Sequence, residues 1–143
     1  MSAESKGISR RLLEEAFNSG NLDVVDELVS PEFVNHDAAQ PEPAVGIEAA
    51  KASIQGYRDA FPDLRIAIEL QVAEGEYVTT QWTAQGTNQG DLMGMPATGK
   101  QATVTGITID RIVDGRIVES WTNWDTLGLL QQLGVVPSLA ATA

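Results

Sequence analysis

The sequence predicts an α+β fold in which three N-terminal helices pack on one face of a strongly curved antiparallel sheet. Amphipathic helical patterns occupy residues 4–18, 21–28 and 46–61, and four strand-like stretches follow them, joined in pairs by short turns. Helices that precede a run of hairpin-connected strands are typical of the α+β class. With 143 residues, 43% of them hydrophobic, the chain suits one domain over residues 1–143.

The helices are predicted from apolar residues at spacings of three and four. In the first helix these residues are Ile8, Leu12, Leu13, Ala16 and Phe17. Gly20 then suits a left-handed helix cap, and Pro31 marks the end of the second helix. The third helix follows Gly46 and stops at Pro62.

The strands are predicted from alternation and from β-branched and aromatic composition. Residues 64–73 and 77–86 form one hairpin, and residues 103–113 and 116–124 form another, joined at Asp114-Gly115. Residues 31–43 are expected to be a short extended piece and a loop. The last six residues, SLAATA, are expected to form a frayed, disordered tail.

Composition excludes several classes of function. The chain has no cysteine, and its 20 acidic and 9 basic residues give a formal charge of -11, which disfavours nucleic acid and anionic membranes as partners. No apolar run approaches the roughly 20 residues that a bilayer span needs, and the N-terminus lacks a signal-peptide core, so we expect a soluble, cytoplasmic protein. One histidine and scattered carboxylates predict no metal site, and no glycine motif predicts a nucleotide cofactor.

Several motifs resemble the SnoaL-like polyketide cyclases, which have the nuclear-transport-factor-2-like fold. The resemblance covers Ile8 to Gly134, and its most specific parts are AFPDL at 60–64, GTNQG at 86–90, MPATGK at 95–100 and RIVDGRIVESWTNWDTLGLLQQLG at 111–134. It implies a cone-shaped, mostly apolar pocket between the helices and the concave face of the sheet. It also implies ring closure by intramolecular aldol condensation without metal or cofactor, with an aspartate as general acid/base.

Asp125 is the match to that aspartate. A carboxylate in an apolar cavity walled by Trp121 and Trp124 would have its charged form disfavoured, which suits a base that removes a proton next to a carbonyl. The alternative is that Asp125 only caps a helix starting at Thr126, because aspartate is a preferred N-cap residue. Both roles are compatible.

His36 and Asn88 are the next candidates. His36 is the only histidine, and it can shuttle a proton near neutral pH, so a pairing with Asp125 across the pocket is expected; the alternative is a structural hydrogen bond. Asn88 follows Gly86-Thr87 where similar proteins often have the histidine of a Gly-Thr-His sequence. Its amide can donate to an enolate oxygen but cannot titrate, and the alternative is a turn residue.

The remaining candidates are aromatic residues that would line the pocket, with ordinary core packing as the alternative: Phe33, Tyr57, Trp82 and Trp121. The alternation of side chains along a strand does not by itself decide which sheet face lines the pocket. Under one choice, the outer face carries Val104, Thr108, Val118, Ser120 and Thr122. Asp110 and Glu119 are expected to face solvent or to pair with other charges.

Two classes of function follow. The first is a cofactor-free lyase or isomerase that acts on a hydrophobic carbonyl substrate by aldol cyclisation or isomerisation, with Asp125 as acid/base and His36 assisting. The second is a non-catalytic module that binds a hydrophobic ligand in the same pocket. In either case a homodimer or higher homo-oligomer is expected, because the outer face of the sheet needs covering.

Overall fold

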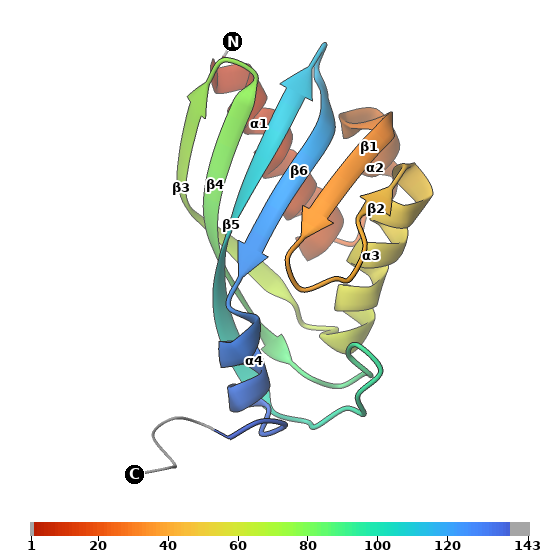
Figure 1. Ribbon diagram of the computed structural model, residues 1–143, viewed down its shortest axis with the longest axis vertical. Coiled ribbons are helices and arrows are strands. Elements are labelled where there is room, and N and C mark those ends of the chain that lie inside the picture. Colours follow the sequence, from red (N-terminus) through yellow and green to blue (C-terminus); the bar gives the residue numbers. More distant parts are fainter. Residues whose placement is uncertain (1, 138–143) are drawn as a thin grey trace.

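In the computed structural model, which describes residues 2–137, helices cover one face of a six-stranded sheet (Figure 1). The sheet is mixed and does not close into a barrel, and its strand order is β2-β1-β6-β5-β4-β3. The α+β class with three N-terminal helical regions is therefore confirmed. The tail expected at residues 138–143 lies outside the described residues.

The first predicted helix is built from two kinds of helical turn. Helix α1, Ser2–Arg11, continues into the π-helix η1, Leu12–Asn18. A π-helix of this length is rare and often marks a functional region. Gly20 has φ 74° and donates to the carbonyl of Ala16 at 3.1 Å, as its predicted capping role requires. Helices α2, Asp23–Leu28, and α3, Ile47–Ala60, complete the layer.

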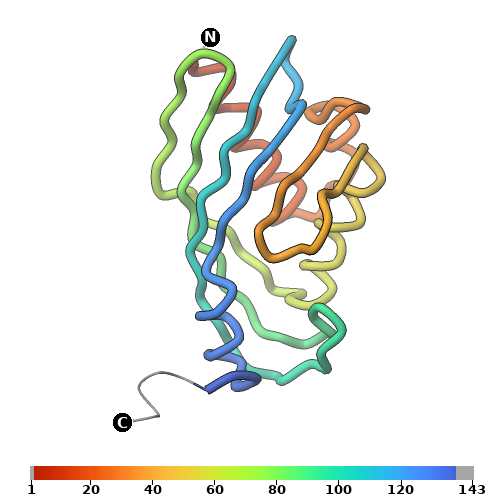
Figure 2. The backbone as a smooth tube through the Cα atoms, viewed as in Figure 1, coloured from red at the N-terminus to blue at the C-terminus, as the bar shows by residue number. Residues whose placement is uncertain are grey.

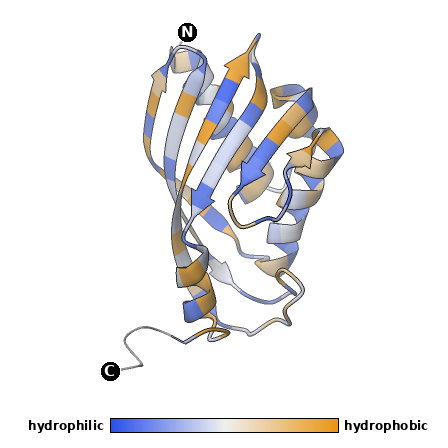
Figure 3. Cartoon of the chain, viewed as in Figure 1, coloured by the Kyte–Doolittle hydropathy of each residue, from blue (hydrophilic) through white to orange (hydrophobic). Residues whose placement is uncertain are grey.

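Both predicted hairpins are present. Strands β3, Arg65–Glu74, and β4, Tyr77–Thr87, pair antiparallel, as do β5, Gln101–Val113, and β6, Arg116–Trp124. In the turn between β5 and β6, Asp114 has φ 51° and Gly115 has φ 77°, the left-handed conformations that an Asp-Gly hairpin turn adopts. Alternating hydrophobic and hydrophilic residues are visible along the strands and along α3 (Figure 3).

The prediction of a purely antiparallel sheet is wrong at one edge. Residues Val29–Asp37 form a full strand, β1, which pairs parallel with β6, and the two-residue strand β2, Ala44–Val45, pairs antiparallel with β1. Figure 2 shows β1 (orange) beside β6 (blue), although the two are far apart in the sequence. Parallel neighbours need a long connection, so pairing of adjacent chain segments could not predict this one.

Two apolar clusters join the helices to the sheet. One is centred on Val25, Ile54 and Ile117, and the other on Phe61, Trp82 and Leu129, the last from the short helix α4, Thr126–Gln132. Both clusters lie on the concave, helix-covered side of the sheet. Polar side chains on this side are therefore candidates for the functional site. None of the helices within residues 2–137 is long and apolar enough to span a bilayer.

The opposite face of the sheet exposes large apolar side chains on β3, β4 and β5: Leu70, Val72, Tyr77, Ile107 and Ile109. Such a patch on an uncovered sheet face is typical of an interaction surface. The patch is where a homodimer or higher homo-oligomer would form, and that oligomer stays a prediction.

We expect light scattering to give a multiple of the 15.3 kDa chain mass, and Ile107→Asp to shift the measured mass towards that of the monomer. Leu127→Asp, at a comparably exposed leucine on α4, is the control; a monomeric parent protein would contradict the prediction.

Candidate active site

A cavity of about 760 Å³ lies between the helices and the concave face of the sheet. Most of its lining is apolar, from η1, the C-cap of α3, β3, β4, β5 and α4: Phe17, Phe61, Ile66, Trp82, Val104 and Leu129. A cavity of this size suits a small organic ligand, and an apolar lining with a few polar groups is typical of small-molecule sites. One group of polar side chains in this lining lies near the end of β1.

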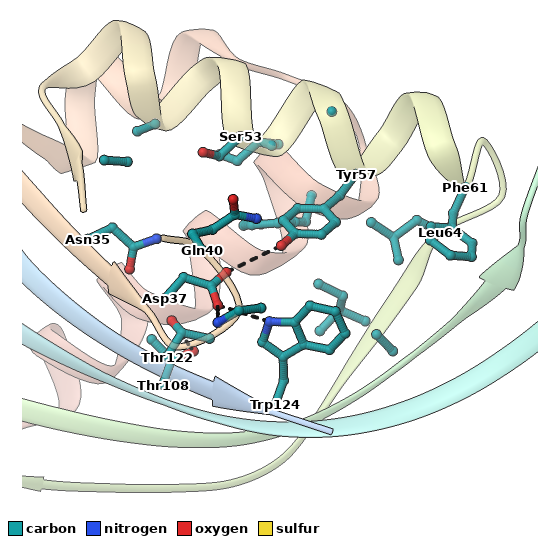
Figure 4. Close-up of a pocket in the computed structure, with 18 of the residues that line it drawn as sticks. Asn35, Asp37, Gln40, Ser53, Tyr57, Phe61, Leu64, Thr108, Thr122 and Trp124 are labelled. Carbon is teal, nitrogen blue, oxygen red and sulfur yellow. Dashed lines mark hydrogen bonds between the residues drawn. The ribbon is translucent and has the colours of Figure 1, made fainter. Parts of the chain in front are cut away.

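Asp37, the last residue of β1, is the carboxylate at the centre of these polar groups (Figure 4). Its Oδ1 accepts hydrogen bonds from Trp124 Nε1 at 3.1 Å and from the backbone N–H of Ala39 at 2.8 Å. Its Oδ2 accepts from the hydroxyl of Tyr57 at 3.3 Å. One carboxylate oxygen is thus held by two donors, and the other makes a single long contact.

Tyr57 comes from α3 and meets Trp124 edge to face, with ring centroids 6.2 Å apart and ring planes at 88°. Burial raises the pKa of Tyr57 to about 12, and the negative charge of Asp37 adds to this effect. The phenol therefore keeps its proton at neutral pH. It can act as a hydrogen-bond donor beside Asp37, but not as a base.

A row of hydroxyl groups continues from Asp37 across the sheet. Asp37 is in register with Thr122 on β6, and Thr122 is in register with Thr108 on β5. The two threonine Oγ1 atoms are 3.3 Å apart, and Thr108 Oγ1 also accepts from Trp82 Nε1 at 3.0 Å. The row places neutral donors and acceptors along the cavity wall, where ligand oxygens can contact them.

This row shows which face of the sheet lines the cavity, a question that the sequence left open. Val104, Thr108, Ser120 and Thr122 line the cavity, so the choice that placed them on the outer face is wrong. Val118 is skipped by the β5–β6 register, which shifts between Arg111 and Ile112. A bulge of this kind reverses the apparent alternation along a strand.

Asp110 on β5 is buried, contrary to the expectation that it faces solvent or pairs with a charge. Its Oδ1 accepts from Ser120 Oγ at 2.5 Å, and its Oδ2 accepts from Ser9 Oγ on α1 at 2.7 Å. Burial raises the pKa of Asp110, and the two serine hydrogen bonds oppose that shift. The carboxyl group thereby links α1 to the wall of the cavity.

The raised pKa of Asp110 predicts a pH-dependent stability. The folded state binds this proton more tightly than the unfolded chain, so the contribution to stability is full below the ordinary carboxyl pKa and is lost as pH rises through the folded-state value. We expect wild type to lose stability relative to Asp110→Asn as pH rises. Urea unfolding of both proteins between pH 4 and pH 8 tests this; a difference that stays constant with pH would contradict it.

Three of the predicted aromatic residues line the cavity. Phe33, Tyr57 and Trp82 all do so, and Phe33 and Trp82 are almost fully buried there. Trp121 does not. It lies on the outer face of the sheet, 6.3 Å from the ring of Tyr77, because alternation along β6 turns Thr122 and Trp124 to the cavity instead.

His36 also lies on the outer face. Its ring stacks on Trp121 with centroids 5.6 Å apart, and its Nε2 is 2.7 Å from Glu119 Oε2. The expectation that Glu119 pairs with a charge is confirmed, since Arg111 Nη2 also lies 3.6 Å from its Oε1. The expected pairing of His36 with Asp125 across the pocket is not present. His36 instead borders a shallow surface pocket of about 290 Å³ with Trp121 and Asn123.

Asp125 is exposed and does not line the cavity. It is the N-cap of α4, and its Oδ1 accepts from the backbone N–H of Gly128 at 2.9 Å, so the capping alternative is confirmed. The expected apolar wall of Trp121 and Trp124 around this residue is wrong. Those two rings lie on opposite faces of the sheet, and the carboxylate that meets Trp124 is Asp37.

Asn88 is fully buried, but it serves the loop after β4 rather than the cavity. Its Oδ1 accepts from the backbone N–H of Thr98 at 2.8 Å and from the Thr98 hydroxyl at 3.0 Å, and its Nδ2 donates to the carbonyl of Gly90 at 2.8 Å. The side chain therefore ties together the two ends of the loop. The predicted structural alternative describes it better than a pocket role does.

Sequence reasoning placed Trp124 in the cavity wall but missed Asp37, although a signal was available. Phe33 was a pocket candidate, and on a strand Asn35 and Asp37 share its face. All three line the cavity. The segment was expected to be largely loop, so alternation was not applied to it. Within residues 2–137, no three histidine, cysteine, aspartate or glutamate side chains are grouped so that they could hold a metal ion.

Comparison with known proteins agrees with this architecture. The family model described as SnoaL-like polyketide cyclase matches residues 8–133. The chain is 35% identical over 126 residues to aklanonic acid methyl ester cyclase DnrD of Streptomyces peucetius, covering 87% of each chain. It is 31% identical over 120 residues to nogalonic acid methyl ester cyclase of Streptomyces nogalater, covering 83% of this chain and 90% of the relative.

Solved structures extend the likeness to three dimensions. TsrD from Streptomyces laurentii has a TM-score of 0.84 and 30% identity, with 94% of this chain and 97% of TsrD covered. IdmH from Streptomyces antibioticus has a TM-score of 0.78 and 35% identity, with 91% of this chain and 98% of IdmH covered. The fold and its length are thus shared with these proteins.

Proposed function

The chain belongs to the SnoaL-like polyketide cyclase family, and from this membership we propose that it closes a ring in a hydrophobic carbonyl compound with Asp37 as the acid/base. Its relatives are named as cyclases, which supports a cyclase-like enzyme. The observation that carries the proposal is the position of the Asp37 carboxylate at the polar end of a largely apolar cavity, beside a phenol that stays protonated.

The proposed reaction is an intramolecular aldol addition. Asp37 Oδ2 removes a proton from a carbon next to a carbonyl group of the substrate, and the resulting enolate attacks a second carbonyl carbon in the same molecule. One carbon–carbon bond forms, and the oxygen of the attacked carbonyl becomes an alkoxide that takes the proton back from Asp37. No atom is gained or lost, so the step needs no oxidant or reductant.

The two oxygens of Asp37 have different roles in this proposal. Oδ1 is fixed by the donors of Trp124 and Ala39, which hold the carboxylate in one orientation. Oδ2 has only the 3.3 Å contact with Tyr57, so it keeps an acceptor position for the substrate proton. A base must come within hydrogen-bond distance of the proton it removes, and a preset orientation favours that approach.

Tyr57 supports the charge that develops on the substrate. Because its pKa is raised to about 12, the phenol keeps its proton throughout the neutral pH range. Its hydrogen bond to Asp37 Oδ2 is released when that oxygen takes the substrate proton, and the phenol then donates to the enolate oxygen. The apolar walls exclude water and hold the carbon skeleton in place, which strengthens the polar interactions at this end. His36 and Asp125 remain testable alternatives for the acid/base role, but neither lines the cavity.

The substrate class is proposed from the relatives and the cavity together. The curated cyclases are named for methyl esters of aklanonic and nogalonic acid. A cavity of about 760 Å³ with one polar end suits a polycyclic compound of this kind. We therefore propose a polyketide-derived methyl ester with two carbonyl groups that can reach each other.

The test is to incubate the purified protein with aklanonic acid methyl ester, nogalonic acid methyl ester and a steroid-like ketone. Aldol closure leaves the mass unchanged, so the product is followed by its chromatographic retention. In deuterated water, an enolate that takes a deuteron back before the ring closes gains deuterium on the carbon next to the carbonyl. Ring closure or deuterium uptake with one compound supports the proposal. Tight binding without either would identify a non-catalytic ligand-binding module.

A further inference from the structure

We propose that Asn35 forms a subsite that accepts a hydrogen bond from a ligand hydroxyl, so that the cavity selects phenol- or enol-bearing polycycles over the same skeleton without a donor. The inference deepens the proposed function, because it specifies the substrate class for the same cavity. It depends on an acceptor that the protein leaves without a donor.

Asn35 lies on β1 between Phe33 and Asp37, and all three side chains line the cavity. Figure 4 shows the Asn35 amide in the same part of the cavity as Asp37 and Gln40. Its Oδ1 is buried, and no group within residues 2–137 donates a hydrogen bond to it. A buried amide oxygen of this kind is uncommon, because most buried side-chain polar atoms have a partner.

The neighbouring donors are already committed to other acceptors. Ser120 is in register with Asn35 on β6, but its hydroxyl donates to Asp110. The hydroxyl of Tyr57 and Nε1 of Trp124 donate to Asp37. Thr108 and Thr122, the remaining hydroxyls in the row, share one hydrogen bond with each other. None of these donors pairs with the Asn35 oxygen.

A ligand can supply the missing donor. A ligand without a donor leaves the buried oxygen without a partner, so its desolvation cost persists in the complex. A ligand hydroxyl aimed at Oδ1 removes that cost. Sites that hydrogen-bond a substrate group discriminate strongly against analogues that lack it.

The subsite is separate from the acid/base. Asn35 and Asp37 are two residues apart on one strand, a separation of roughly 7 Å. A hydroxyl on Asn35 would therefore belong to a part of the ring system away from the reacting carbon. It would fix which end of a flat polycycle faces Asp37, so Asn35 acts as a positioning residue.

Binding of three unreactive ligands tests the proposal without any turnover: 2-hydroxyanthraquinone, 2-methoxyanthraquinone and anthraquinone. Quenching of tryptophan fluorescence gives the dissociation constants, since Trp82 and Trp124 line the cavity. We expect wild type to bind the hydroxy compound about tenfold more tightly than either ligand without a donor, the factor that corresponds to about 1.4 kcal/mol. In Asn35→Leu the three affinities should converge, with anthraquinone still bound.

Asn123→Leu is the matched control, because it makes the same change on the exposed face of β6 and should keep the tenfold preference. Retained binding of anthraquinone by Asn35→Leu shows that the cavity is intact. Equal affinities in wild type would overturn the inference. So would a preference that survives in Asn35→Leu but disappears in Asp37→Asn, because the hydroxyl would then be bound by Asp37. Since no ligand reacts, these outcomes do not depend on whether the protein is a cyclase.

Discussion

Replacing Asp37 with asparagine is expected to lower kcat for ring closure by about 10²- to 10⁴-fold, the usual contribution of a general acid/base. The amide keeps an oxygen that can accept from Trp124 Nε1 and from the Ala39 N–H, so the side chain should stay in place. Its nitrogen, however, cannot take a proton from carbon. We therefore expect KM to change little, which separates loss of chemistry from loss of binding.

Asp125→Asn is the matched control for this substitution. The chemical change is the same, the residue is exposed, and asparagine is as good an N-cap as aspartate, so α4 should be retained. Steady-state kinetics of the two variants on the same substrate compare the two carboxylates directly. Loss of turnover in Asp125→Asn with full turnover in Asp37→Asn would favour the assignment made from the sequence and refute that of Asp37.

The sequence was sufficient for those parts of the fold that depend on neighbouring residues. Periodicities of 3.6 and 2 identified the helices and both hairpins, and the Asp114-Gly115 turn has the left-handed backbone that its residue types favour. It was not sufficient for β1. The pairing of His36 with Trp121 joins residues far apart in the chain, and the choice of partner depends on how α2 and α3 pack, which local patterns do not encode.

The same limit explains why the sequence placed the wrong residues in the candidate site. Alternation groups the residues of a strand into two faces, but only the helix layer decides which face is enclosed. Trp124 thus became part of the cavity and Trp121 did not. Asp125 follows directly after Trp124, yet the strand ends there and the helix begins, so its carboxylate turns to the backbone N–H of Gly128. Strand parity cannot be extended past such a boundary.

Gly106→Ala is expected to destabilise the fold and to deform the cavity, because Trp82 lies directly over this glycine. The two residues are cross-strand partners on β5 and β4, and a Cβ atom at residue 106 would come within 2.3 Å of the indole ring. The ring would have to move, which would break its 3.0 Å hydrogen bond to Thr108. Overpacking of this kind costs about 1–3 kcal/mol, which urea unfolding at pH 7 measures.

Gly7→Ala is the matched control, because nothing lies within 4 Å of a Cβ atom at that position in α1. Alanine is the better helix former, so this change should stabilise the protein by about 0.5–1 kcal/mol, opposite in sign to the cavity variant. A double-mutant cycle with Trp82→Phe isolates the contact, since a smaller ring leaves room for the added methyl group. If Gly106→Ala is equally destabilising in both backgrounds, the indole is not the group that requires glycine at this position.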